Sequence, residues 1–218
     1  MKGLLIKDVK YLMMQKRFFI VVLGFGFFLS ITGENPLSCV GYITMLITIF
    51  TLSTISYDEY ENGMSFLMTL PIHRNMYAMA KYIFAGGIAV LSAVISAIIA
   101  IIAGRILNIS LIMKELLLTS SIMIIFSWLT LAVTIPMQIK YGVEKARIVL
   151  LVICGGVLGI GYLLSKGSAY LGIDLLSMVE NFFSMNKVIL LVIGVAVFVI
   201  VLLTSYAWSV CIMKKREF

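Results

Sequence analysis

The chain has 218 residues, of which 62% are hydrophobic and only 12% are charged, whereas about a quarter of an ordinary soluble domain is charged. A soluble core of this size has no room for so much apolar surface, so the composition excludes a soluble globular enzyme, a disordered chain and a secreted disulfide scaffold. The net charge of +7 is distributed in a way that indicates membrane topology rather than nucleic-acid binding.

The first predicted element is an N-terminal arm over residues 1–17. Leu5, Val9 and Leu12 fall at helical spacing, with Lys7 and Lys10 roughly opposite. This pattern predicts an amphipathic helix that lies at the membrane interface, and the alternative is a frayed basic leader. The arm is long, mixes apolar with charged residues and precedes no small-residue cleavage site, so it does not resemble a secretory signal peptide.

Six apolar stretches follow, and each approaches the length of about 20 residues that crosses a bilayer as a helix. A charge at the centre of a membrane helix costs roughly 2.5–3.5 kcal/mol on insertion scales, and none of the six contains Asp, Glu, Lys, Arg or His. We therefore predict an all-α integral membrane protein with one transmembrane domain over residues 1–218. The predicted spans are 18–32, 37–56, 82–103, 116–135, 148–165 and 188–213.

The connections between these spans alternate in charge. Thirteen of the seventeen basic residues fall on the side of the N-terminal arm, and the other four are Arg105, Lys114, Lys166 and Lys187. Because cytoplasmic loops carry the excess of Lys and Arg, this asymmetry places both termini in the cytoplasm.

The second predicted span carries three threonines, Thr44, Thr48 and Thr51, on one face. They are a possible lining of a translocation pathway. The favoured alternative is structural, because hydroxyl groups in membrane helices commonly bond to their own backbone or to a neighbouring helix.

The cytoplasmic loop over residues 57–76 combines three acidic residues with a short apolar segment, 64–70, that Pro71 ends. Seven residues cannot cross a bilayer, so the segment is either a short helix that docks on a soluble partner or one that folds back on the membrane surface. The candidate docking residues are Met64, Ser65, Phe66, Leu67, Met68 and Leu70.

On the other side of the membrane, residues 166–187 contain apolar side chains at i, i+1, i+4, i+7 and i+8. The pattern predicts an extracytoplasmic amphipathic helix. Its role is either an outer gate where an apolar substrate leaves or a lid that packs on the bundle without touching substrate. The gate residues are Leu175, Leu176, Val179, Phe182 and Phe183.

The sequence contains no motif typical of a catalytic, metal-binding or nucleotide-binding site. The spans contain no ionisable group that could serve catalysis or proton coupling, and the single histidine, His73, lies in a loop. There is no zinc-binding spacing and no phosphate-binding loop. We therefore expect no catalytic residue, no metal and no cofactor in this chain, and transport against a gradient would need energy from a partner.

Three motifs carry a resemblance to a known family. They are Asp58-Glu59-Tyr60-Glu61-Asn62-Gly63, then Leu70-Pro71-Ile72-His73-Arg74, then Ala80-Lys81-Tyr82. Together with the opening Met1-Lys2-Gly3-Leu4-Leu5-Ile6-Lys7-Asp8, the chain resembles permease subunits of type-2 ABC exporters. The nearest groups are the permeases of phenol-soluble-modulin exporters and of lantibiotic-immunity transporters.

The resemblance implies a multi-pass protein of the bacterial plasma membrane that works with a separate ATP-binding subunit, which would hold ATP and Mg²⁺. It implies that 64–70 is the coupling helix and 1–17 the elbow helix. We expect ion pairs from the coupling loop to the elbow helix or to the ATP-binding subunit, made by Asp58, Glu59, Glu61 and Arg74. The uncharged spans favour an amphipathic or hydrophobic substrate, and the resemblance suggests a peptide exported by alternating access.

Six helices in a ring leave a hole of only about one helix diameter, so we expect a second copy or a sister permease to complete the pathway. Two other classes stay open. One is a partner-free membrane channel or hole-forming protein, although the spans offer little polar lumen. The other is a membrane enzyme that uses the loop carboxylates with His73, although that loop carries no signature of a reaction.

Overall fold

The computed structural model describes residues 1–33, 35–60, 63–69, 73–109, 112–142, 145–146, 148–149, 151–152, 155–156, 159 and 187–215. All regular secondary structure in these residues is helical. The helices in chain order are α1 (Lys2–Met14), α2 (Lys16–Thr32), α3 (Ser38–Thr51), α4 (Ser53–Glu59), α5 (Gly63–Thr69), α6 (Arg74–Ile106), α7 (Met113–Tyr141) and α10 (Lys187–Lys215).

Four of the described helical segments are long and apolar enough to cross a membrane. They are Ser38–Glu59, which joins α3 and α4, then α6, α7 and Gly194–Lys215 within α10. A fifth candidate arises if α1 and α2, which are bent by 65° against each other, count as one span. These helices confirm the predicted all-α membrane class. The predicted span 148–165 and the predicted outer helix lie largely or wholly outside the described residues, so the number of six spans stays a prediction.

The long helices extend beyond the predicted spans. Helix α6 has 33 residues and is therefore about 50 Å long, whereas the hydrocarbon core of a bilayer is about 30 Å thick. Since the predicted span begins only at residue 82, we expect the first two turns of α6 to project beyond the hydrocarbon. The side chains of Tyr77 and Lys81 lie in this projecting part.

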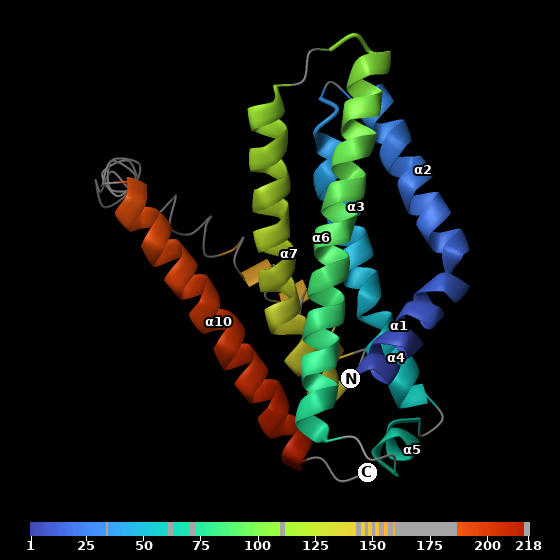
Figure 1. Cartoon of the computed structure of the whole chain (residues 1–218), viewed down its shortest axis with the longest axis vertical. Helices are drawn as coiled ribbons and strands as arrows, with labels where there is room; N and C mark the ends of the chain where they lie inside the picture. The colour runs from blue at the N-terminus through green and yellow to red at the C-terminus, as the bar shows by residue number, and fades with distance from the viewer. Residues whose placement is uncertain are drawn as a thin grey trace.

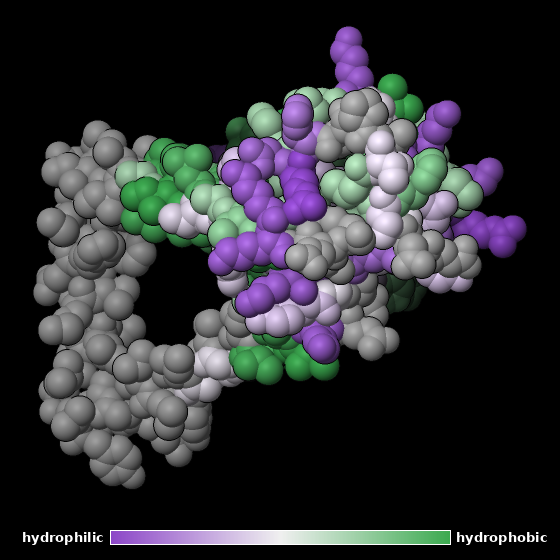
Figure 2. Space-filling model, turned by 90° about the horizontal axis from the view of Figure 1, so that it is seen from below, coloured by the Kyte–Doolittle hydropathy of each residue, from purple (hydrophilic) through white to green (hydrophobic). Residues whose placement is uncertain are grey.

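Helix α6 is the central element of the bundle. It packs against α1, α2, α3, α7 and α10, and Figure 1 shows α2 and α10 on opposite sides of it. The start of α1, the short helix α5 and the end of α10 all lie at the same end of the molecule (Figure 1). Figure 2 looks onto this end and shows hydrophilic residues gathered across it.

A proline inside α7 shapes the contact with α10. Pro136 has no N–H, so the carbonyl of Ala132, four residues earlier, loses its usual helical donor. The hydroxyl of Ser205 on α10 donates a hydrogen bond to this carbonyl. The Tyr82 hydroxyl on α6 lies 2.5 Å from Ser205 Oγ and 3.0 Å from Ser209 Oγ. These bonds connect α6, α7 and α10 within the apolar bundle.

The crossing of α6 and α7 depends on a glycine. A Cβ atom added at Gly86 would lie 2.2 Å from Cζ2 of Trp128, whereas one added at the adjacent Gly87 would meet no atom within 4 Å. We expect Gly86→Ala to lower the free energy of unfolding by about 1–3 kcal/mol, because a rigid indole ring has to move. Gly87→Ala is the matched control and is expected to leave stability unchanged or slightly raised. Thermal unfolding of the two purified variants in detergent tests this, and equal melting temperatures would contradict it.

Candidate functional site

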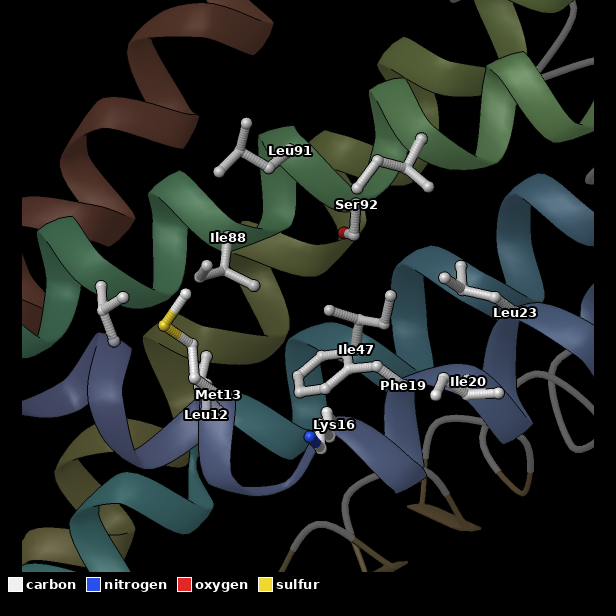
Figure 3. A pocket seen from close by; sticks show the side chains of 12 residues that line it. Leu12, Met13, Lys16, Phe19, Ile20, Leu23, Ile47, Ile88, Leu91 and Ser92 are labelled. Atoms are coloured by element: carbon white, nitrogen blue, oxygen red, sulfur yellow. The ribbon is translucent and has the colours of Figure 1, made fainter.

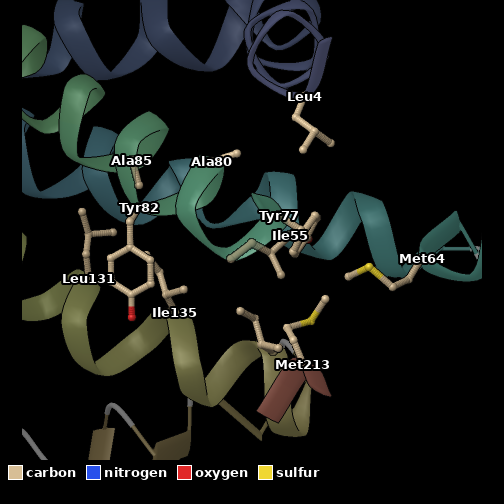
Figure 4. Packing of buried hydrophobic residues seen from close by; sticks show 11 residues of the cluster. Leu4, Ile55, Met64, Tyr77, Ala80, Tyr82, Ala85, Leu131, Ile135 and Met213 are labelled. Atoms are coloured by element: carbon tan, nitrogen blue, oxygen red, sulfur yellow. The ribbon is translucent and has the colours of Figure 1, made fainter. Parts of the chain in front are cut away.

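The short helix α5 has one face on the bundle and one face exposed. Met64 is buried in a cluster with Ile55 and Tyr77 (Figure 4), and Leu67 and Met68 pack against the same cluster. Phe66, in contrast, is 68% exposed. Thus α5 packs on protein through its inner face and exposes the aromatic side chain of Phe66 on its outer face. Of the other predicted docking residues, Ser65 is half-buried, and Leu70 lies outside the described residues.

A glycine brings α5 against the end of α4. A Cβ atom at Gly63 would lie 2.9 Å from the backbone oxygen of Asp58, which is closer than real Cβ contacts allow. Gly63 is the first residue of α5. Because Gly63 has no side chain, the backbone at the start of α5 can lie directly against the last turn of α4.

Behind α5 lies a buried network of ionised side chains from three helices. Asp8 of α1, Asp58 of α4 and Lys81 of α6 are only 1–3% exposed. The Lys81 ammonium lies 2.8 and 2.9 Å from the two carboxylate oxygens of Asp8 and 2.8 Å from Asp58 Oδ2. It also donates to the hydroxyl of Thr54 at 3.2 Å. One ammonium thus joins the N-terminal helix, the segment before α5 and the projecting end of α6.

Two further side chains complete this network. Lys7 of α1 pairs with Asp58 Oδ1 and lies 3.7 Å from Asp8 Oδ1. The Tyr77 hydroxyl donates to Asp58 Oδ2 at 3.0 Å. We call Lys7, Asp8, Asp58, Tyr77 and Lys81 the buried ion network. Its two cations balance its two anions.

The electrostatics of the network favour a structural role over an acid–base one. Burial raises the pKa of Asp8 above its ordinary value, and the charge of Lys81 acts in the opposite direction. Breaking a buried pair is costly because it leaves an uncompensated charge. Within the described residues, no three His, Cys, Asp or Glu side chains are grouped to hold a metal ion. The network is suited to holding three helices in one arrangement.

The predicted ion-pairing residues have different surroundings. Asp58 contacts Lys7 of α1, on the predicted elbow helix. The Arg74 guanidinium donates to the carbonyl oxygens of Met213 and Lys214 at 3.1 and 2.8 Å, where a cation is favourable because a helix C-terminus carries partial negative charge. Glu59 Oε2 lies beside Gly142, at the end of α7. Glu61 lies outside the described residues. A role of these residues toward an ATP-binding subunit stays a prediction.

No sequence pattern indicated that Asp8, Lys81 and Tyr77 belong to one site. Leu5, Val9 and Leu12 form the apolar face that is predicted to lie at the membrane interface, whereas the residues of α1 that are buried against protein are Leu4, Asp8 and Leu12. The spacing of four residues from Leu4 to Leu12 includes Asp8, and only this periodicity could have indicated that the carboxylate faces inward.

The three threonines of the second span are buried where α3 packs against α6. Thr44 Oγ1 lies 3.2 Å from Ser96 Oγ of α6, and the Thr51 hydroxyl donates to the backbone oxygen of Thr48 at 2.6 Å. Thr44 and Thr51 thus make the bonds of the structural alternative, whereas Thr48 Oγ1 is buried without a hydrogen-bond partner among the described residues. The role of the three threonines as pathway lining stays a prediction. The predicted outer gate, 175–183, lies outside the described residues.

Two cavities open between the described helices. The first, of about 440 Å³, lies in the angle between α1 and α2 and against α3 and α6 (Figure 3). The second, of about 310 Å³, lies among α2, α3, α4 and α7 and has the polar residues Ser53, Ser56, Thr134 and Gln138 in its wall. The Gln138 amide donates to the Leu52 carbonyl and to Ser56 Oγ, both at 3.0 Å. Thr44, Thr48 and Thr51 are not among the residues that line either cavity.

Comparison with known protein families identifies the family of this chain. The family described as ABC-2 family transporter protein matches the chain over residues 3–214. No curated protein and no solved structure matches it. The family match covers α1, the buried ion network, α5 and nearly all of α10. This chain therefore belongs to the ABC-2 transporter family.

Proposed function

We propose that this chain is the permease subunit of an ATP-driven exporter. Its family implies a membrane transport component that works with an ATP-binding subunit. The single observation that carries the finer proposal is the shape of α5: its inner face is anchored by Met64, while Phe66 on its outer face is 68% exposed. An exposed aromatic side chain is the kind of residue that anchors a protein interface.

In this proposal α5 is the coupling helix and α1 the elbow helix. Closure of the ATP-binding subunits around ATP would move α5, and the contact of Gly63 with the Asp58 backbone would pass this movement to α4. Through Asp58 and Lys81 the buried ion network would then carry it to α1 and α6. The ATP-binding partner thus biases an equilibrium between inward-open and outward-open arrangements.

The remaining parts of the proposal concern substrate and assembly. We propose six spans, cytoplasmic termini in a bacterial plasma membrane, and a second copy or sister permease that completes the pathway. The substrate is amphipathic or hydrophobic, and a peptide is the class suggested by the resemblance to phenol-soluble-modulin and lantibiotic-immunity permeases. The uncharged wall of the second cavity, which combines Gln138 with aromatic Phe18 and Phe50, is compatible with an uncharged amphipathic ligand.

Co-purification tests this function. The tagged chain is expressed in its own cells, extracted in mild detergent and isolated with whatever it binds. The expected result is a stoichiometric partner that carries an ATP-binding phosphate loop and hydrolyses ATP. The opposing result is a chain that purifies alone and, after reconstitution, makes a bilayer conduct ions, which would favour the partner-free channel.

A further inference from the structure

The first cavity is apolar almost throughout. Its wall comes from four helices and includes Met13, Phe19, Ile20, Ile88 and Leu91. The one hydroxyl in the wall, that of Ser92, already donates to the Ala89 carbonyl at 2.9 Å. Apart from the Lys16 ammonium at its edge, the described wall offers no free side-chain hydrogen-bonding group, so a polar occupant deep in the cavity would lose its bonds to water without replacement. A hydrocarbon chain makes no hydrogen bonds to water and therefore loses none when it enters the cavity.

The wall also contains a cationic side chain. Lys16 lies at the bend between α1 and α2 and is labelled in Figure 3 beside Met13 and Phe19. It is exposed, and no ion pair or hydrogen bond connects its ammonium to another described residue. The carboxylate nearest along α1, Asp8, is already engaged by Lys81 and Lys7. The cavity thus combines an apolar wall with one positive charge that lacks a counter-charge in the described protein.

The position of the cavity in the membrane decides which ligand it meets. Leu91 and Ile95 belong to the predicted span 82–103, and Leu23 belongs to the predicted span 18–32. Lys16 precedes that span by two residues, at the level where a helix leaves the hydrocarbon for the headgroup region. With these predicted spans we expect the apolar wall to face lipid and the Lys16 ammonium, at the end of a long flexible side chain, to reach the lipid phosphates.

We propose that this cavity binds an anionic phospholipid. The acyl chain lies along Phe19, Ile88 and Leu91, and the phosphate pairs with the Lys16 ammonium. A zwitterionic lipid offers the same chain, but its own cation competes for the phosphate. One basic residue near an anionic membrane surface contributes about 1 kcal/mol, which corresponds to a preference of about fivefold. Free phosphate could pair with the Lys16 ammonium in the same way, and the experiment below distinguishes it from the phosphate of a lipid.

Native mass spectrometry of the purified chain in detergent measures this binding without an ATP-binding subunit, so the result does not depend on the proposed function. The probes are phosphatidylglycerol and phosphatidylcholine with identical acyl chains. We expect about fivefold tighter binding of phosphatidylglycerol, loss of this preference in Lys16→Gln and its retention in Lys16→Arg. Lys114→Gln, an exposed lysine on α7 outside the cavity wall, is the matched control and is expected to keep the preference.

A second variant tests whether the acyl chain occupies the apolar cavity. Leu91 is exposed at the rim, so Leu91→Trp fills the cavity without disturbing the core and is expected to weaken both lipids alike. The proposal is overturned if the two lipids bind equally to the unaltered chain, or if Lys16→Gln keeps the preference. It is also overturned if glycerol phosphate, which has no acyl chain, displaces phosphatidylglycerol at equal concentration, because the site would then be one for free phosphate.

Discussion

Replacing Lys81 with methionine is expected to lower the free energy of unfolding by about 3–5 kcal/mol, the cost of removing one partner from a buried ion pair. The substitution leaves the buried carboxylates of Asp8 and Asp58 without the ammonium that both contact. Lys7 can compensate only one of them. Denaturant-induced unfolding of the purified chain in mixed micelles measures the loss.

Two controls make this result specific. Lys10→Met removes an exposed lysine from α1, the helix that carries Asp8, and is expected to change stability by less than about 0.5 kcal/mol. The double variant Lys81→Met/Asp8→Asn restores charge balance and is expected to recover about 1–3 kcal/mol relative to the single variant. If Lys81→Met unfolds like Lys10→Met, the network does not hold the three helices together.

The second large effect is expected at the outer face of α5. Phe66→Asp should weaken binding of the ATP-binding subunit by at least about 30-fold, because loss of an aromatic anchor typically costs about 2 kcal/mol or more. Stability should stay nearly unchanged, since Phe66 is 68% exposed. The measurement is titration of the ATP-binding subunit onto the chain in nanodiscs, together with the melting temperature of each variant.

The choice of Phe66 over its neighbour follows from packing. Leu67 is packed against the core cluster, so a charge there would disturb folding and docking together. The matched control is Tyr141→Asp, which introduces the same charge at an exposed aromatic residue at the end of α7. A docking role for α5 is contradicted if Phe66→Asp binds the ATP-binding subunit as tightly as the unaltered chain, or if Tyr141→Asp weakens binding equally.

Apolar runs predicted much of the fold. The runs at 82–103 and 116–135 lie within α6 and α7, because about 20 uncharged apolar residues satisfy their backbone most easily as a membrane helix. The ends of these helices were not predictable in the same way. Beyond the hydrocarbon, α6 continues through Tyr77 and Lys81 because these side chains have partners on other helices, and hydropathy does not register such partners.

The site was less predictable than the fold. The acidic loop and the short apolar segment indicated a docking element, and the structure contains a helix, α5, in that segment. The sequence could not indicate that Asp8 and Lys81, 73 residues apart, form one ion pair, because no local pattern links them. Gly63 illustrates a further limit: a glycine that breaks a chain and a glycine that allows close packing look identical in a sequence.

The most direct test of the central claim is to ask what touches position 66 in intact membranes. A photoreactive p-benzoylphenylalanine is incorporated there in place of Phe66, and in a parallel chain in place of Phe28, an exposed residue of α2 within the predicted first span. On irradiation, the chain labelled at position 66 is expected to capture a protein with an ATP-binding phosphate loop, and the chain labelled at position 28 is not. Capture of lipid alone from position 66 would contradict the account.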